Sequence, residues 1–188
     1  MALTPSKMVP LGTKAYSFEL PDTITDQVMH LDDLKSDIAT VIMFICNHCP
    51  YVKHVKEELV KISDEYSRLG LSFIAISSND IEQYPEDSPE KMKEEAQTYG
   101  YHFPYLYDES QSVARDYDAA CTPDFYVFDK NMELAYRGQL DESRPGNEKP
   151  LNGKDLREAL DSIIAGNPVS QNQIPSVGCN IKWKELAD

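Results

Sequence analysis

The stretch that decides the fold is residues 40–50, Thr40-Val41-Ile42-Met43-Phe44-Ile45-Cys46-Asn47-His48-Cys49-Pro50. Its first half is a run rich in β-branched and aromatic residues, which is typical of a central strand buried on both faces. Two cysteines and a proline follow directly. This order predicts a buried strand, then a Cys-X-X-Cys pair, then the start of a helix.

The residues after Pro50 have the period of a helix. Apolar side chains stand at 52, 55, 59, 62, 66 and 69, which predicts one face of an amphipathic helix of about five turns. Gly70 is suited to end that helix. The apolar run at 71–76 predicts a second buried strand, so the segment reads as a βαβ unit with a right-handed crossover.

The rest of the chain predicts one α/β unit with a tail. An extended segment precedes the first buried strand, an antiparallel hairpin is expected at 125–136, and a last helix at 156–163. We expect residues 1–168 to form a single domain. The tail, 169–188, is weakly structured by pattern, but its apolar residues suggest that it docks back on that domain.

Charge and hydropathy restrict the partners. The 188 residues include 18 Lys and Arg against 32 Asp and Glu, a net charge of −14. Such a surface repels phosphates, so nucleic acid and anionic membranes are not expected as partners. The sequence has neither a long apolar run nor the pattern of a signal peptide, so we expect a cytoplasmic protein. No organic cofactor is implied.

Cys49 is the predicted nucleophile. With Pro50 at the first helical position, Cys49 falls at the N-cap. Its sulfur would lie near the first-turn amides, which favour the thiolate and lower the pKa below ~8.5. Cys46 stands one turn earlier and is close enough to act as a resolving thiol.

A second predicted element of the site is Thr122-Pro123, just before the strand at Phe125. Proline is tolerated at the start of a strand because it need not donate to the ladder. A cis bond there would leave a backbone edge open for an extended substrate peptide. Cys121 directly precedes this pair. It either faces the substrate site or is a buried residue of apolar character.

Together these features resemble the thioredoxin fold, with a central mixed sheet flanked by helices, an N-terminal β extension and a C-terminal tail. Within that fold the chain resembles the alkyl hydroperoxide reductase/thiol-specific antioxidant family, and more narrowly its bacterial peroxiredoxin-like subgroup. The motifs that carry the resemblance are Cys46–Val52, Tyr84–Pro89, Phe103–Leu106, Cys121–Asp124, Arg137–Gln139, Ser143–Pro145 and Gly178–Trp183. The resemblance implies antioxidant-type thiol chemistry.

The chain departs from both model chemistries of that group. Peroxiredoxins place a Thr three residues before the peroxidatic cysteine. Here the residue three positions before Cys49 is Cys46, and the residue three positions before Cys46 is Met43. Thioredoxins carry a buried acid on the strand before the motif, and this strand has none. His48 is then the nearest group for proton transfer. The alternative interpretation is an exposed loop histidine without a catalytic role.

The first hypothesis is a thiol–disulfide oxidoreductase. Cys49 attacks a protein or small-molecule disulfide, and Cys46, or else Cys179 on a docked tail, resolves the mixed disulfide. A thioredoxin-type or low-molecular-weight thiol reductant restores the protein. The alternatives are a protein that binds copper or zinc at the cysteine site or senses redox state without turnover, and a non-standard thiol peroxidase. The acidic residues of 80–95 are interpreted as a solvated face.

Overall fold

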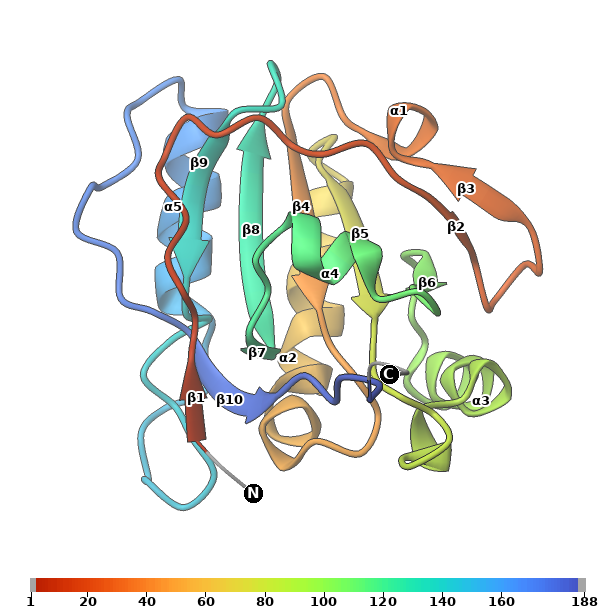
Figure 1. Ribbon diagram of the computed structural model, residues 1–188. Helices are drawn as coiled ribbons and strands as arrows, with labels where there is room; N and C mark the ends of the chain where they lie inside the picture. Colours follow the sequence, from red (N-terminus) through yellow and green to blue (C-terminus); the bar gives the residue numbers. More distant parts are fainter. Residues whose placement is uncertain (1–2, 186–188) are drawn as a thin grey trace.

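The computed structural model describes residues 3–185, and a five-stranded mixed sheet lies at its centre (Figure 1). The strand order is β6-β5-β4-β8-β9. The first three strands are parallel to one another, and β8 and β9 run antiparallel to their neighbours. This arrangement confirms the predicted thioredoxin-like α/β class. The strands are β4 (Ala39–Phe44), β5 (Ser72–Ser77), β6 (Tyr105–Tyr107), β8 (Asp124–Asp129) and β9 (Leu134–Gly138).

Helices cover both faces of the central sheet (Figure 1). One face packs against α2 (Pro50–Ser67), α3 (Pro89–Tyr99) and α5 (Lys154–Ile164). The other face is covered by α1 (Leu31–Leu34), α4 (Ser112–Asp116) and the segment that contains Phe18 and Leu20. A short 3₁₀ helix, η1 (Pro85–Asp87), precedes α3.

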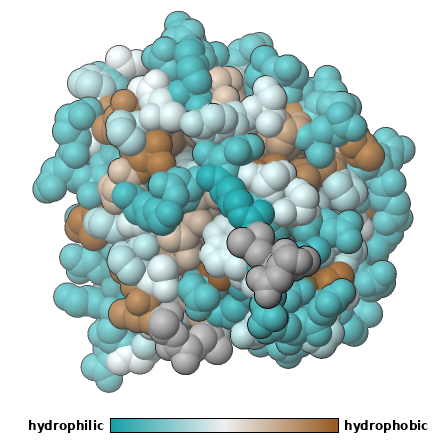
Figure 2. Space-filling model, in the orientation of Figure 1, coloured by the Kyte–Doolittle hydropathy of each residue, from teal (hydrophilic) through white to brown (hydrophobic). Residues whose placement is uncertain are grey.

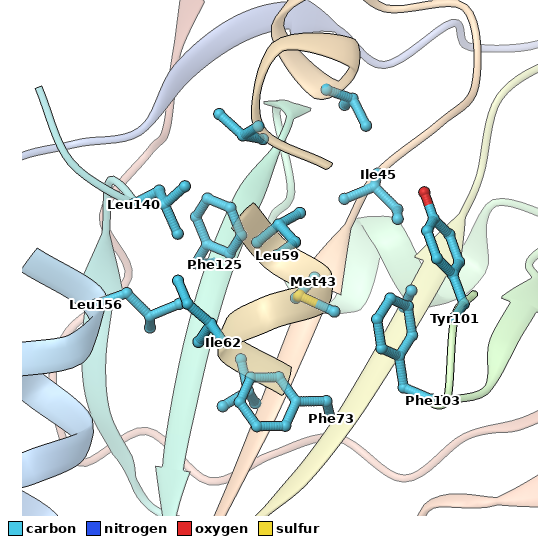
Figure 3. Close-up of a cluster of buried hydrophobic side chains, with 14 of the residues drawn as sticks. Met43, Ile45, Leu59, Ile62, Phe73, Tyr101, Phe103, Phe125, Leu140 and Leu156 are labelled. Carbon is cyan, nitrogen blue, oxygen red and sulfur yellow. The ribbon is translucent and has the colours of Figure 1, made fainter. Parts of the chain in front are cut away.

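The alternation of side chains on β4 divides the core into these two layers. Met43 points into the layer under α2, as Figure 3 shows, and Phe44 belongs to the opposite layer. Successive side chains of a strand point to opposite faces, so a strand that is apolar throughout must be covered twice. Helix α2 ends at Ser67, and Leu69 is exposed beyond it. The prediction that residue 69 belongs to the apolar face of this helix is therefore wrong.

A small second sheet brings the C-terminal segment to the body. It consists of β1 (Leu3–Pro5), β10 (Val177–Asn180) and β7 (Cys121–Thr122), with β10 in the middle. The predicted tail is therefore not weakly structured throughout, because β10 exchanges backbone hydrogen bonds with both neighbours. Residues 186–188 of that tail lie outside the described residues. The remaining strands, β2 (Glu19–Pro21) and β3 (Val28–His30), form a hairpin.

The face shown in Figure 2 is largely hydrophilic, with apolar residues scattered among charged ones. This agrees with the large excess of acidic residues in the composition. Within residues 3–185, no helix combines the length and the apolar character needed to cross a membrane.

Candidate active site

Cys49 lies at the N-terminal end of the long helix α2, as predicted. It is the N-cap residue, with φ −65° and ψ 123°, and Pro50 takes the first helical position. Proline fits there because the first helical N–H has no partner within the helix. The loop that joins β4 to α2 therefore holds Cys49 over the first-turn amides, and the amide of Val52 donates a hydrogen bond to its sulfur.

Three cysteine sulfurs gather around Thr122. The Sγ of Cys49 lies 2.7 Å from the Sγ of Cys179 and 3.3 Å from the carbonyl oxygen of Thr122. The Sγ of Cys46 lies 3.4 Å from the hydroxyl of the same threonine. None of these sulfurs is in a disulfide bond. The site thus combines the end of β4, the start of α2, and strands β7 and β10.

The pKa of Cys49 is lowered to about 5. The largest cause is the hydrogen bond from the thiol of Cys46, and burial works against it. Further hydrogen bonds from Cys179, the Val52 amide and Thr122 stabilise the charged sulfur. Hydrogen bonds to the charged form of an acid favour that form, so Cys49 is a thiolate at neutral pH.

The two neighbouring cysteines have the opposite character. Burial raises the pKa of Cys46 well above its usual range, and the hydrogen bond to Cys49 and the charge of Asp87 add to this effect. Burial and the hydrogen bond to Cys49 raise the pKa of Cys179 to about 12. One thiolate flanked by two protonated thiols is the pattern that thiol–disulfide exchange requires, because a thiolate attacks and a thiol stays in reserve.

The Thr122–Pro123 peptide bond is cis, as considered from the sequence, but the backbone edge beside it is not open. Strand β10 pairs with β7, with Cys179 opposite Thr122. Cys49 is 0% exposed beneath this strand. The expectation of an open edge is therefore wrong in this conformation, because the C-terminal segment already occupies it.

His48 is buried, so the alternative of an exposed loop histidine is wrong. Its Nδ1 lies 2.6 Å from a carboxylate oxygen of Asp87, and its ring stacks on Tyr84 with a centroid distance of 4.8 Å. The Nε2 of His48 is buried without a hydrogen-bond partner in the described structure. A hydrogen on Nδ1 fits the Asp87 contact and leaves a lone pair on Nε2.

Asp87 is the residue of this site that the sequence argument missed. The sequence predicts a solvated acidic face here, but Asp87 is 0% exposed and accepts hydrogen bonds from the amides of Asn47 and His48 and from the side chain of Asn79. Burial raises its pKa, yet the hydrogen bonds from His48 and Asn79 outweigh this and lower it. The Tyr84–Pro89 motif was the available signal, and it carried no indication of burial.

Cys121 does not join the sulfur cluster. Its sulfur faces the backbone oxygens of Pro123 and Ser176, at 3.8 and 4.0 Å. Burial and the nearby charge of Asp124 raise its pKa. Cys121 is therefore a buried thiol within β7, which agrees with the buried apolar role and not with a place in the substrate site.

One group of side chains fits a metal ion. Ligating atoms of Cys46, His48 and Asp87 all lie within 4.8 Å of one another, and all three residues are buried. Sulfur, imidazole and carboxylate donors suit zinc or copper. The sequence suggests Cys46, His48, Cys49 and a distant Cys121 as ligands, whereas the structure groups Cys46 and His48 with Asp87.

Solved structures that resemble this chain over nearly its whole length include two with substantial sequence identity. An uncharacterized conserved protein from Geobacillus kaustophilus is 58% identical, with a TM-score of 0.98 over 100% of this chain and 99% of that one. A hypothetical protein from Sinorhizobium meliloti 1021 is 46% identical, with a TM-score of 0.94 over 97% and 99%. The peroxidoxin BcpB from Mycobacterium tuberculosis, 19% identical with a TM-score of 0.62 over 82% and 96%, shares the fold.

A search of curated proteins gives no match. The sequence model of the AhpC/TSA family matches residues 11–137, which is more than half of the chain and includes Cys46, Cys49 and Pro123. The chain therefore belongs to the AhpC/TSA family, and its chemistry is thiol-based redox chemistry.

Proposed function

We propose that the protein is a thiol–disulfide oxidoreductase in which Cys49 is the attacking thiolate. The observation that carries the proposal is the position of its sulfur, on the tip of α2 and 2.7 Å from the sulfur of Cys179. A disulfide bond is ~2.05 Å long, so a small movement suffices to join these two atoms.

The reaction proceeds by two exchanges. The Cys49 thiolate attacks one sulfur of a substrate disulfide, a bond forms between them, and the other substrate sulfur leaves as a thiolate. A resolving thiol then attacks the Cys49 sulfur and releases the second substrate sulfur. The substrate gains two electrons, and the protein is left with one intramolecular disulfide.

We assign the resolving role first to Cys179 and second to Cys46. The sequence favoured the reverse order, because Cys46 is nearer in the chain. The 2.7 Å contact between the sulfurs of Cys49 and Cys179 supports Cys179. A thioredoxin-type protein or a low-molecular-weight thiol would then reduce the disulfide.

His48 and Asp87 serve the proton steps in this proposal. A resolving thiol must lose its proton as it attacks, and the departing thiolate must gain one. His48 lies next to Cys49 in the chain, and Asp87 holds its ring. Its buried Nε2 has no hydrogen-bond partner among the described residues, which leaves this atom available for proton transfer.

The test is reduction of insulin disulfides with dithiothreitol as the electron source. We expect the activity to be lost in Cys49→Ser and retained in Cys121→Ser, because the Cys121 thiol faces away from the cluster. Loss in Cys46→Ser with full activity in Cys49→Ser would contradict the assignment. Thiol consumption that depends on added peroxide, with no reduction of insulin, would instead identify a peroxidase.

Metal binding is the second candidate, favoured by the cluster of Cys46, His48 and Asp87. Titration of the reduced protein with zinc or copper(I) would test it. One equivalent bound tightly by the wild type, and lost in Asp87→Ala and His48→Ala, would support a metal site. Equal weak binding by the wild type and both variants would exclude it.

A further inference from the structure

Strand β10 occupies the backbone edge at which the sequence predicts an extended substrate peptide. Its residues pair antiparallel with β7, with Cys179 opposite Thr122 and Asn180 opposite Cys121. The same strand directs a cysteine sulfur to within 2.7 Å of the Cys49 sulfur. The backbone pairing and the sulfur contact are the two interactions that a cysteine-containing peptide would make with this site.

Gly178 is the feature that fits β10 to this position. A Cβ at Gly178 would overlap the carbonyl oxygen of Thr122 and would lie 2.7 Å from its carbonyl carbon and 3.3 Å from the Cδ of Pro123. The atoms that are too close belong to backbone, which cannot turn away as a flexible side chain can. The space over Thr122 therefore admits only glycine directly before the cysteine.

We propose that β10 is an internal copy of the substrate, and that the substrate is an extended polypeptide segment with the sequence Gly-Cys. This inference rests on the proposed function and names its substrate class. The incoming segment takes the place of Val177–Asn180 on β7. Its glycine lies over the Thr122 carbonyl, and its cysteine sulfur faces Cys49.

The attachment of β10 allows such an exchange. Its ladder with β7 comprises only two residue pairs, and its other partner is the three-residue strand β1 near the N-terminus. The chain before it, 165–176, contains no helix or strand and is mostly exposed. For β10 to leave β7, these ladder bonds and the flanking bonds from the Ser6 amide to the Ser176 carbonyl and from the Ile181 amide to the Ala120 carbonyl must break.

The exchange also supplies the resolving step. The Cys49 thiolate attacks the cysteine sulfur of the bound segment, an S–S bond forms, and the former sulfur partner of that cysteine leaves as a thiolate. When β10 returns to β7, the Cys179 thiol loses its proton and attacks the Cys49 sulfur. The peptide leaves as a thiolate, and Cys49 and Cys179 become the disulfide.

Two peptides test the proposal on the full-length reduced protein. They are acetyl-Val-Gly-Cys-Asn-amide, which copies β10, and acetyl-Val-Ala-Cys-Asn-amide, each with the cysteine in a mixed disulfide with thionitrobenzoate. The rate of thionitrobenzoate release is followed by absorbance, and Cys49→Ser gives the background. We expect the glycine peptide to react at least tenfold faster than the alanine peptide.

A variant tests the fit of β10 independently. Gly178→Ala is expected to displace β10 and to raise the rate of Cys49 alkylation by iodoacetamide at least tenfold. Val177→Ala is the matched control, because it shortens a side chain in the same strand and adds no atom over Thr122. If Gly178→Ala does not fold, the peptide comparison decides alone.

The outcomes separate this inference from the proposed function. Equal Cys49-dependent rates for the two peptides, or unchanged alkylation in a folded Gly178→Ala, would overturn the substrate assignment. Insulin reduction that still requires Cys49 would then leave the proposed function in place. Absence of every Cys49-dependent reaction, with peptides and with insulin, would overturn both.

Discussion

The sulfurs of Cys49 and Cys179 lie 2.7 Å apart, although 130 positions separate the two residues in the chain. Both sulfurs use the same end of α2, because the Val52 amide donates to Cys49 and the Tyr51 amide donates to Cys179. The positive end of one helix therefore faces two sulfurs that arrive from different elements. The pKa of Cys49 therefore depends on the position of β10, because Cys179 of that strand donates a hydrogen bond to the Cys49 sulfur at this helix end.

The reactivity of Cys49 is expected to follow a pKa of about 5. Alkylation by iodoacetamide at a series of pH values, read for each cysteine by mass spectrometry, measures this. The rate for Cys49 should be level near pH 7 and fall as the pH drops through about 5. A half-maximal rate near the ordinary thiol pKa of ~8.5 would contradict the prediction.

The same pKa predicts a pH dependence of stability. The folded pKa lies below that of the unfolded chain, so the contribution of Cys49 is complete above ~8.5. It declines as the pH falls and is lost below about 5. The free energy of unfolding, from urea titrations at several pH values, should show this slope in the wild type and lack it in Cys49→Ala.

Removal of the Cys46 thiol should raise the pKa of Cys49. The hydrogen bond from Cys46 is the largest cause of the low value, so Cys46→Ala is expected to move the alkylation midpoint well above 5. Cys121→Ala is the matched control and should leave the midpoint near its original value. Identical midpoints in Cys46→Ala and the wild type would show that the helix end alone sets the acidity.

Substitution of Asp87 should destabilise the loop between the two cysteines. In Asp87→Asn an amide replaces an oxygen that accepts from His48 and Asn79, so buried donors lose partners. We expect a loss of about 1–3 kcal/mol in the free energy of unfolding. Urea titration measures it, with the exposed neighbour Glu86→Gln as control, for which a change within about 0.5 kcal/mol is expected.

The difference between wild type and Asp87→Asn should also depend on pH. The pKa of Asp87 is lowered in the folded protein, so its contribution is present above the unfolded value of ~3.9. That contribution is lost as the pH falls through the lower folded value. Equal differences at neutral and at acidic pH would argue against an ionised Asp87.

A buried ion pair behind the site predicts strong coupling. Arg137 and Asp124 are both 0% exposed, and their charged groups lie 3.2 Å apart. Arg137→Met leaves the carboxylate buried without its partner, at a cost of about 3–5 kcal/mol. Adding Asp124→Asn should recover part of this loss in urea titrations. Additive losses in the double variant would show that the two residues act independently.

Most of the fold follows from local pattern. The uniformly apolar strand at 40–45, the spacing of apolar residues after Pro50 and the glycine stop predict β4, α2 and β5 within one or two residues. These elements have strong periodicity and definite ends, so their local sequence is sufficient. The N-cap position of Cys49 follows from Pro50 alone.

The cover of the site could not be predicted in the same way. Strand β10 is four residues long and pairs with β1 and β7, from opposite parts of the chain, so its conformation depends on long-range contacts. The burial of Asp87 could not be predicted from local sequence either, because an acidic residue in an acidic segment gives no local sign of burial. The pairing of Cys49 with Cys179 and of His48 with Asp87 depends on these two placements.

The account is tested most directly by mapping the disulfide formed on mild oxidation. The reduced protein is treated with one equivalent of oxidised dithiothreitol or diamide, blocked with iodoacetamide, and digested for mass spectrometry. We predict a Cys49–Cys179 disulfide as the main product, with Cys46 and Cys121 alkylated. A product in which Cys49 remains an alkylated thiol while another pair is joined would contradict the account.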